Sequence, residues 1–577
     1  IASKNEDAKG ISILCSDCQQ AIYPHGLYHK RKHKALTLLG YDSSQAKMDN
    51  ETLLAQRQKL ISKPTKFPKY SERHRQKIDY SFEFLMDDHT PISYCDFDNT
   101  NSPSTLKKVK NSSVKALSIC QDKNSTWQGD MEDRFFVVDS YGNRSDTCFL
   151  GLVDGYHGVT AAETVAAELP LLFLDQLAQT DSSYKKTKEE QQILNSFATV
   201  IKADYRKNEK IFSDKQDDKT NKTNTYEWIH KAYAKSFWRM DKLLQLGRNE
   251  VSKVRWSGCS AVTCLMERLP RENTDGTEEE RKHFENSTHS PLTRSAEDVA
   301  GLLHIANIGN VHAVLCKNGK SYCLSKEHST SNVSERKRIL QNGGNISTNE
   351  PDGLVEGYLR TTRGLGHHGD PVLKRSVIPV PHSISVPIDN SCQFLVLASN
   401  GLWEVLDYNE VCALTLATFT HYLRMHECDQ QNGASLYKCQ HLMTLSEEDL
   451  NDSEATNDLP DGIEILYPNK DIFLTGSREK RDSKILCDKP ASYTGQQLLK
   501  TALSVYSKSS TDFEEDTKTH LSNCKSQTAG RGRVTSETLY GNAARYISEQ
   551  LVKSALAAGS RDNITILIVL LNGCDKI

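Results

Sequence analysis

The sequence predicts an α+β fold in which helices pack on the outside of β-sheets. Short runs rich in Val, Ile, Leu and Phe recur along the chain, and several of them are apolar on both faces. Burial on both faces indicates the interior of a sandwich or a sheet covered by helices. Long helical patterns alternate with these runs. Strand groups interleaved with a few long helices are typical of a mixed α and β domain.

Seven strand candidates define the expected sheets. Each is a short apolar run bounded by polar or turn residues, which is the usual pattern of a buried strand. In chain order they are RFFVVDS (134–140), TCFLGLVD (147–154), CSAVTCLM (259–266), LLHIANIG (302–309), VHAVLC (311–316), FLVLAS (394–399) and ITILIVLL (564–571).

Three long segments have the periodicity of helices. The segment 160–179 opens with Thr160 and Glu163, the spacing of a capping box. The segments 226–246 and 543–559 each align large apolar residues on one face. These residues are Ile229, Tyr233, Phe237, Met240 and Leu244 in the first, and Ile547, Leu551 and Ala555 in the second. Gly559, at the end of the last segment, favours a left-handed C-cap.

The composition predicts a soluble intracellular protein, cytoplasmic or nuclear. Hydrophobic residues make up 37% of the 577 residues, and the mean hydropathy of −0.58 indicates long solvated insertions. A net charge of −3 gives no global field that favours nucleic acid or an acidic membrane. The first ten residues lack the apolar core of a signal peptide, and the longest apolar run is too short to span a bilayer. The 16 cysteines are therefore expected to be reduced.

The chain divides into three expected parts. Residues 1–45 form a small Cys/His module, residues 46–113 a linker or extension, and residues 114–572 the main domain. Polar insertions interrupt this domain at about 181–224, 270–298 and 427–537.

Five short motifs carry polar residues at the ends of strand candidates. They are MEDRFF (131–136), LVDGYHG (152–158), ANIGNVHAVL (306–315), ASNGLWEV (398–405) and SRDNITI (560–566). Each alone is consistent with an ordinary turn, as the Asn-Gly pair at 400–401 shows. Five in this order are much more specific.

With these motifs, the chain resembles the metal-dependent protein serine/threonine phosphatases of type 2C, the PPM family. The resemblance covers about residues 114–571 and is strongest to the type 2C-like group, which looks like a set of degenerate relatives. It extends to WSGCSAVTCLM (256–266), LSKEHSTSNVSERKRILQNGG (324–344) and VEGYLRTTRGLG (355–366). It implies a four-layer α/β/β/α sandwich, with two central antiparallel sheets flanked by helices.

The resemblance also implies a site for two Mg²⁺ or Mn²⁺ ions at one end of the sandwich. Hard divalent cations take carboxylate and carbonyl oxygens, and a pair of them activates a water for attack on phosphorus. Carried over by motif, Asp154 would bridge the ions, with the Gly155 carbonyl and Glu132 on one of them. Asp562, beside Asn563, would serve the other ion. Asp133 would support the set from behind.

Three departures from the family pattern affect the metal ligands. Asn400 stands where the resembling motif has an aspartate, so the amide oxygen brings no charge. Glu404 replaces a second aspartate, and Asn310 replaces an aspartate of a further, looser metal site. Asn310 and Asn400 are also good turn residues, which is the alternative explanation of both positions.

Two further departures affect the expected catalytic groups. Gln128 stands where the family has an arginine that grips the substrate phosphate, and glutamine offers no charged fork. Tyr156 replaces a histidine proposed to protonate the leaving group. His157 lies one place later, where an extended backbone would point it the other way.

These departures predict a pseudophosphatase with weak or residual Mg²⁺ or Mn²⁺ binding and a binding or scaffold role. The expected partners are proteins or phosphoproteins. Binding to a membrane is not expected, and binding to nucleic acid is disfavoured. The alternative is an active Mg/Mn-dependent serine/threonine phosphatase with a variant site, in which Tyr156 or His157 supplies the proton. A third hypothesis is a metal-free adaptor centred on the N-terminal module.

The N-terminal module contains a possible Zn²⁺ site. Cys15 and Cys18 are followed by His29 and His33, and two thiolates with two imidazoles suit tetrahedral zinc. The ten-residue gap between Cys18 and His29 is shorter than in a standard finger. The alternative is a basic helix, HKRKHK, with incidental histidines.

Overall fold

The described residues cover most of the sandwich and of the N-terminal module. The computed structural model describes residues 13–22, 27–42, 48–62, 68–86, 103–197, 200, 226–245, 256–268, 299–347, 353–432 and 536–577. The expected insertion at 270–298 and most of those at 181–224 and 427–537 lie outside these residues. None of the helices in the described ranges is both long and apolar enough to cross a lipid bilayer.

The first central sheet has six strands in the order β10-β9-β13-β14-β4-β3. The strands are β10 (Lys320–Cys323), β9 (His312–Lys317), β13 (Cys392–Ala398), β14 (Ile564–Leu571), β4 (Val114–Asp122) and β3 (Thr105–Leu106). All of its pairings are antiparallel. The two most apolar runs of the chain, β13 and β14, lie side by side at its centre, with Leu395 opposite Val569.

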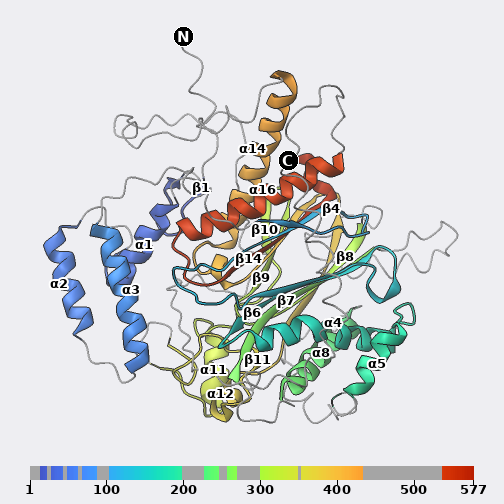
Figure 1. Ribbon diagram of the computed structural model, residues 1–577, viewed down its shortest axis with the longest axis horizontal. Coiled ribbons are helices and arrows are strands. Elements are labelled where there is room, and N and C mark those ends of the chain that lie inside the picture. The colour runs from blue at the N-terminus through green and yellow to red at the C-terminus, as the bar shows by residue number, and fades with distance from the viewer. Residues whose placement is uncertain are drawn as a thin grey trace, which may run out of the picture.

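The second central sheet lies against the first (Figure 1) and is also antiparallel. Its order is β12-β8-β7-β6-β5, with β11 also paired to β7. The strands are β12 (His382–Asp389), β8 (Val299–Ile308), β7 (Gly258–Arg268), β6 (Thr147–Tyr156), β5 (Arg134–Val138) and β11 (Leu365–Gly366).

Helices cover the outer face of each sheet, which gives four layers (Figure 1). Helices α14 (Tyr408–Asn432) and α16 (Ser536–Ala557) pack on the first sheet, with the short α13 (Asn400–Trp403) beside them. Helices α4 (Thr160–Thr180) and α8 (Glu227–Gln245) cover the second sheet, and α5 (Lys188–Ser196) packs beside α4. The expected α/β/β/α sandwich is confirmed.

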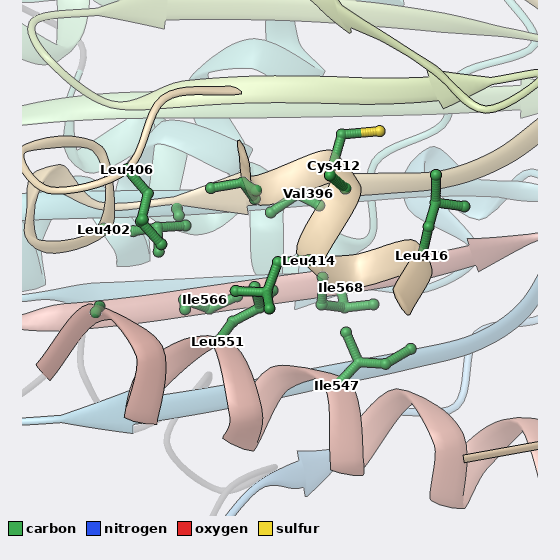
Figure 2. Close-up of a cluster of buried hydrophobic side chains, with 14 of the residues drawn as sticks. Val396, Leu402, Leu406, Cys412, Leu414, Leu416, Ile547, Leu551, Ile566 and Ile568 are labelled. Carbon is green, nitrogen blue, oxygen red and sulfur yellow. The ribbon is translucent and has the colours of Figure 1, made fainter. Parts of the chain in front are cut away.

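Alternation along the central strands explains why they are apolar on both faces. On β13, Val396 faces α14 and α16, whereas Leu395 and Leu397 face the second sheet. Figure 2 shows the outer cluster, where Val396 and Ile568 of the sheet lie near Leu414 of α14 and Leu551 of α16. Burying such side chains contributes roughly 1.5–3 kcal/mol each, so both faces of the strand stabilise the sandwich.

All seven predicted strands are present, and the helix corresponding to 226–246 buries the five predicted apolar residues. Two local predictions are wrong. The capping box of α4 is absent, because Val159 is the N-cap residue and Glu163 instead forms an ion pair with Arg134. The expected Asn-Gly turn at 400–401 is the start of the one-turn helix α13.

The segment 46–113, predicted to be a linker or extension, contains two helices and one strand in its described residues. Helices α1 (Tyr28–Leu38), α2 (Asn50–Ile61) and α3 (Pro68–Met86) share a small apolar cluster centred on Leu39, Leu53 and Ile78. The N-terminal module therefore extends to residue 86. Strand β3 joins the edge of the first sheet, so the main domain begins before residue 114.

Two short helices pack together near the end of β6. Helix α11 (Val333–Gln341) and helix α12 (Pro371–Ser376) share an apolar cluster with Val355, Leu359 and Tyr156. This cluster places both helices next to the end of β6, beside the predicted metal site.

Candidate functional site

The five sequence motifs meet at one end of the sandwich. Glu132 and Asp133 precede β5, Asp154 lies near the end of β6, and Asp562 precedes β14. Because neighbouring strands are antiparallel, the start of β5 adjoins the end of β6. The start of β14 adjoins the end of β13 in the same way. The fold therefore brings Asp133, Asp154, Asn400 and Asp562 together across the two sheets.

Asn400 lies between the two principal carboxylates of this site. Its backbone N–H donates a hydrogen bond to Asp154 Oδ2 at 2.9 Å, and its side-chain Nδ2 donates to Asp562 Oδ2 at 3.2 Å. An aspartate at this position has no side-chain N–H to donate. The amide therefore acts as a hydrogen-bond donor toward Asp562, where the resembling motif has a third negative charge.

Burial and mutual repulsion shift the pKa values of these carboxyl groups upward. Burial, followed by the charges of Asp133 and Asp562, raises the pKa of Asp154 well above its ordinary value. Burial and the Glu404 charge raise the pKa of Asp562 to about 7. Burial also raises the pKa of Asp133 to about 6. A buried group of like charges of this kind favours either a bound cation or protonation.

Hydrogen bonds across the two sheets hold the mouth of the site. Thr565 of β14 donates through Oγ1 to Asp133 Oδ2 at 2.8 Å, as expected if Asp133 supports the site from behind. Asn563 Oδ1 accepts from the Glu132 N–H at 2.8 Å. These two bonds join the segment before β5 to the start of β14.

Two glycines allow backbone segments to approach each other in the site. A Cβ at Gly155 would lie 2.5 Å from the Glu132 carbonyl oxygen. A Cβ at Gly401 would lie 2.2 Å from the Asn563 carbonyl oxygen. Only glycine fits at either position without a backbone shift, so both close approaches depend on it.

Gln128 reaches the site but carries no charge into it. Its Nε2 donates to the Arg561 carbonyl at 3.0 Å and to Asp562 Oδ1 at 3.4 Å. An arginine there would present a fixed fork of donors to a phosphate. Gln128 instead gives Asp562 another neutral amide donor.

Glu404 binds the loop before Asp562. Its Oε1 accepts hydrogen bonds from Ser560 Oγ at 3.1 Å and from the Arg561 N–H at 2.5 Å. Asn310, the other predicted loss, follows β8 and is half-buried. Glu404 therefore keeps a charge near the site, while its two hydrogen bonds hold the loop at residues 560–561 in place.

Tyr156 packs into the cluster beneath α11 and α12. Its ring stacks on His367 with 5.2 Å between centroids, and His157 meets His367 edge-on at 5.3 Å. Burial holds the pKa of Tyr156 far above its ordinary value, so the phenol is a poor acid near pH 7. The expected extended backbone at His157 is wrong, because its φ of 63° is left-handed.

His367 was missed by the sequence analysis. It is buried, and burial together with the neighbouring His157 lowers its pKa well below its ordinary value. Nothing in the sequence marks His367, because a histidine in the loop GLGHHG gives no signal until the fold brings it to Tyr156.

The chemistry of the donors fits a weakened site for Mg²⁺ or Mn²⁺. Asp154, Asp562, Glu132 and the Gly155 carbonyl offer the oxygen ligands that these ions take. Asn400 brings a neutral amide to this set, where the resembling motif has a carboxylate. Within the described residues, only the N-terminal quartet brings three or more Cys, His, Asp or Glu ligand atoms within 4.8 Å of one another.

That quartet consists of Cys15, Cys18, His29 and His33. Cys15 follows β1 (Ile13–Leu14), which pairs with β2 (Ala21–Ile22), and both histidines lie one turn apart on α1. Cys18 Sγ is 3.1 Å from His29 Nε2, and the two Nε2 atoms are 2.7 Å apart. Burial opposes ionisation of Cys15, but hydrogen bonds from His29 and His33 outweigh it and lower its pKa to about 5.

Comparison with known proteins supports this reading of the fold. A protein phosphatase 2C-like domain-containing protein 1 from Homo sapiens is 41% identical over 98% of this chain and 90% of its own length. The chain belongs to the protein phosphatase 2C family. The relative of the same description from Mus musculus is 37% identical over 98% of this chain and 89% of its own length.

The family model for protein phosphatase 2C matches residues 276–431. A solved serine-threonine phosphatase 2C from Toxoplasma gondii aligns over 82% of this chain and 99% of that chain, with 13% identity and a TM-score of 0.38. Protein phosphatase 2C enzymes are serine/threonine phosphatases that generally use Mg²⁺ or Mn²⁺.

Proposed function

We propose that this protein is a protein phosphatase 2C-like pseudophosphatase, which keeps the fold of the family and has lost most of its phosphatase chemistry. One observation carries the proposal. The neutral side-chain amides of Asn400 and Gln128 both donate hydrogen bonds to Asp562, while the Asn400 backbone N–H donates to Asp154. These two carboxylates are the ones on which the resemblance places the metal ions.

An amide compensates a buried carboxylate less than a cation does. A hydrogen bond from a neutral donor contributes roughly 0.5–1.5 kcal/mol net, whereas a divalent cation offsets two charges at once. Burial and neighbouring like charges raise the pKa values of both Asp154 and Asp562. Asp154, Asp562, Glu132 and the Gly155 carbonyl would hold a residual Mg²⁺ or Mn²⁺. When bound, such an ion would lower the pKa of a coordinated water.

The remaining groups do little for phosphoryl transfer. Gln128 offers a neutral hydrogen bond to a phosphate oxygen. Tyr156 keeps its proton at neutral pH, because its hydroxyl is buried against the α11 and α12 cluster. The role that follows is binding or scaffolding, with proteins or phosphoproteins as the proposed ligands.

Turnover measured on the full-length chain tests this proposal. Hydrolysis of a phosphothreonine peptide in millimolar Mn²⁺ is expected to be no faster for the wild-type protein than for Asp154→Asn. Both proteins are compared after their folding has been checked by circular dichroism. Wild-type turnover that disappears in Asp154→Asn would favour the active-phosphatase alternative.

We also propose that the N-terminal quartet binds Zn²⁺. Two sulfur and two nitrogen ligands at one point are the ligand set of structural tetrahedral zinc sites. The lowered pKa of Cys15 supports this choice, because thiolate is the form that binds zinc. The convergence of all four ligand atoms favours zinc over a basic helix with incidental histidines.

A further inference from the structure

Helix α1 carries half of the quartet and several side-chain contacts between the N-terminal module and the sandwich. His29 and His33 supply two of the ligands. Lys30, directly after the first histidine, forms an ion pair with Glu410 of α14 at 2.9 Å and with Asp17 at 2.8 Å. The Ser16 N–H donates to the same Glu410 oxygen at 2.8 Å. The residues between the two cysteines are therefore docked on α14 as well.

Lys34, directly after the second histidine, connects α1 to the loop of the phosphatase-like site. Its Nζ donates a hydrogen bond to the Glu404 carbonyl oxygen. The Glu404 carboxylate holds Ser560 and the Arg561 N–H, and Asp562 is the next residue. Two hydrogen-bonding steps thus link a zinc ligand, His33, to a metal ligand, Asp562.

Aromatic contacts form a second connection to the same loop. The Arg31 guanidinium lies over the rings of Tyr80 and Phe84, at 4.7 Å and 4.3 Å from their centroids. Tyr80 of α3 meets Trp127 edge-on at 4.8 Å. The Arg561 guanidinium lies over the ring of the same Trp127, 5.3 Å from its centroid.

These contacts place the module against both sides of the degenerate site. Trp127 precedes Gln128, and Arg561 precedes Asp562, so each packed residue adjoins a residue that reaches the site. Arg561 also donates to Ser81 Oγ of α3 at 3.4 Å. Gly559 packs against Arg31, and a Cβ there would lie 3.0 Å from Arg31 Cγ.

The hairpin that supplies the cysteines is short, and Ile13, Cys15 and Ile22 hold it by packing in the apolar cluster under α14. Strands β1 and β2 are two residues long each, and an isolated two-stranded hairpin is marginal at best in water. Metal binding that orders a small module contributes directly to its folding. Zinc would add to the packing that holds the two cysteines in place.

We propose that zinc at Cys15, Cys18, His29 and His33 fixes α1 where Lys34 and Arg31 brace the 558–562 loop, so that zinc occupancy controls the order of the phosphatase-like site. This inference rests on the zinc proposal and is independent of whether the site retains activity. The N-terminal module would then act as a metal-dependent clasp, which means that it holds the 558–562 loop in place only when zinc is bound.

Hydrogen exchange measured by mass spectrometry on the full-length chain tests the clasp. The purified protein is expected to contain one zinc per chain. Removing it with 1,10-phenanthroline is expected to speed exchange in peptides covering 27–42 and also in those covering 124–130 and 558–563. Loss of a hydrogen bond to a charged acceptor predicts about tenfold faster exchange at the Arg561 amide. Peptides from β6 and β7 should not change.

Two variants separate zinc binding from the clasp. Cys18→Ser is expected to lose zinc and to reproduce the chelated pattern, whereas the matched control Cys323→Ser, at another half-buried thiol, should retain both. Lys34→Met keeps all four ligands, so it should retain zinc and still speed exchange at 558–563. A protein that binds no zinc would overturn the zinc proposal. Zinc removal that affects only residues 13–42 would overturn the clasp and leave zinc binding intact.

Discussion

The combined variant Gln128→Arg, Tyr156→His and Asn400→Asp is expected to hydrolyse a phosphothreonine peptide in Mn²⁺ at least about 100-fold faster than the wild-type protein. A positioned general acid alone contributes roughly 10²–10⁴ in rate. Arginine restores a charged bidentate contact to phosphate. Aspartate at position 400 replaces a side-chain N–H donor to Asp562 with a charged oxygen ligand of the kind that Mg²⁺ and Mn²⁺ prefer.

The structure indicates how to control this experiment. Tyr156 packs against the α11 and α12 cluster, so Tyr156→His removes buried contacts and its folding must be checked. The double variant Gln128→Arg and Asn400→Asp leaves that cluster intact and should show a smaller gain. Adding Asp154→Asn to the triple variant should abolish the gain. A folded triple variant no faster than the wild type would show that these three positions do not limit the chemistry.

Glu335→Ala is expected to destabilise the protein by about 3–5 kcal/mol, the usual effect of removing one partner of a buried ion pair. Glu335 on α11 and Arg363 are 2% and 3% exposed, and their closest contact is 2.6 Å. Thr362 and Arg338 also donate to Glu335, at 2.8 Å and 3.0 Å. The variant would leave the Arg363 guanidinium buried without its carboxylate.

Chemical denaturation measures this loss, with Lys337→Ala as the control. Lys337 is exposed on the same helix, so its substitution should change stability by less than about 0.5 kcal/mol. An equal effect of both variants would mean that the ion pair is not what holds α11.

The same ion pair predicts the direction of a pH effect. Burial alone would raise the pKa of Glu335, but hydrogen bonds and charge from Arg363 outweigh it and hold the pKa well below its ordinary value. A carboxyl group with a lowered pKa stabilises the fold above its unfolded pKa and loses that contribution as the pH falls. The stability difference between wild type and Glu335→Ala should therefore be full at pH 7 and shrink below about pH 4.

The strands of the sandwich core could be predicted from the sequence because their signal is local. Runs such as FLVLAS and ITILIVLL need burial on both faces, and only a layered fold provides it. Strand β4, VKALSICQD, was missed because lysine, serine and glutamine interrupt its apolar pattern. Strand β12, HSISVPID, was missed because alternating serines and a proline are weak strand signals.

The candidate site was predictable as a set of residues but not as a geometry. The motifs identify Asp154, Asn400 and Asp562, yet only the fold shows that Asn400 donates to both carboxylates. Glu404 was identified only as a replacement for a second aspartate, and the fold shows that its carboxylate accepts from Ser560 Oγ and the Arg561 N–H. The contact between Lys34 and Glu404 leaves no local signal in the sequence, because the two residues are 370 positions apart.

The account depends most on neutral amides having taken the place of a metal ion between Asp154 and Asp562. Calorimetric titration of the zinc-loaded, full-length protein with Mn²⁺ at neutral pH tests this most directly, with Asp154→Asn as the reference for binding elsewhere. We predict no difference between the two proteins at Mn²⁺ concentrations below about 1 mM, a concentration that corresponds to roughly 4 kcal/mol of binding free energy. Micromolar binding by the wild-type protein that is lost in Asp154→Asn would contradict the account.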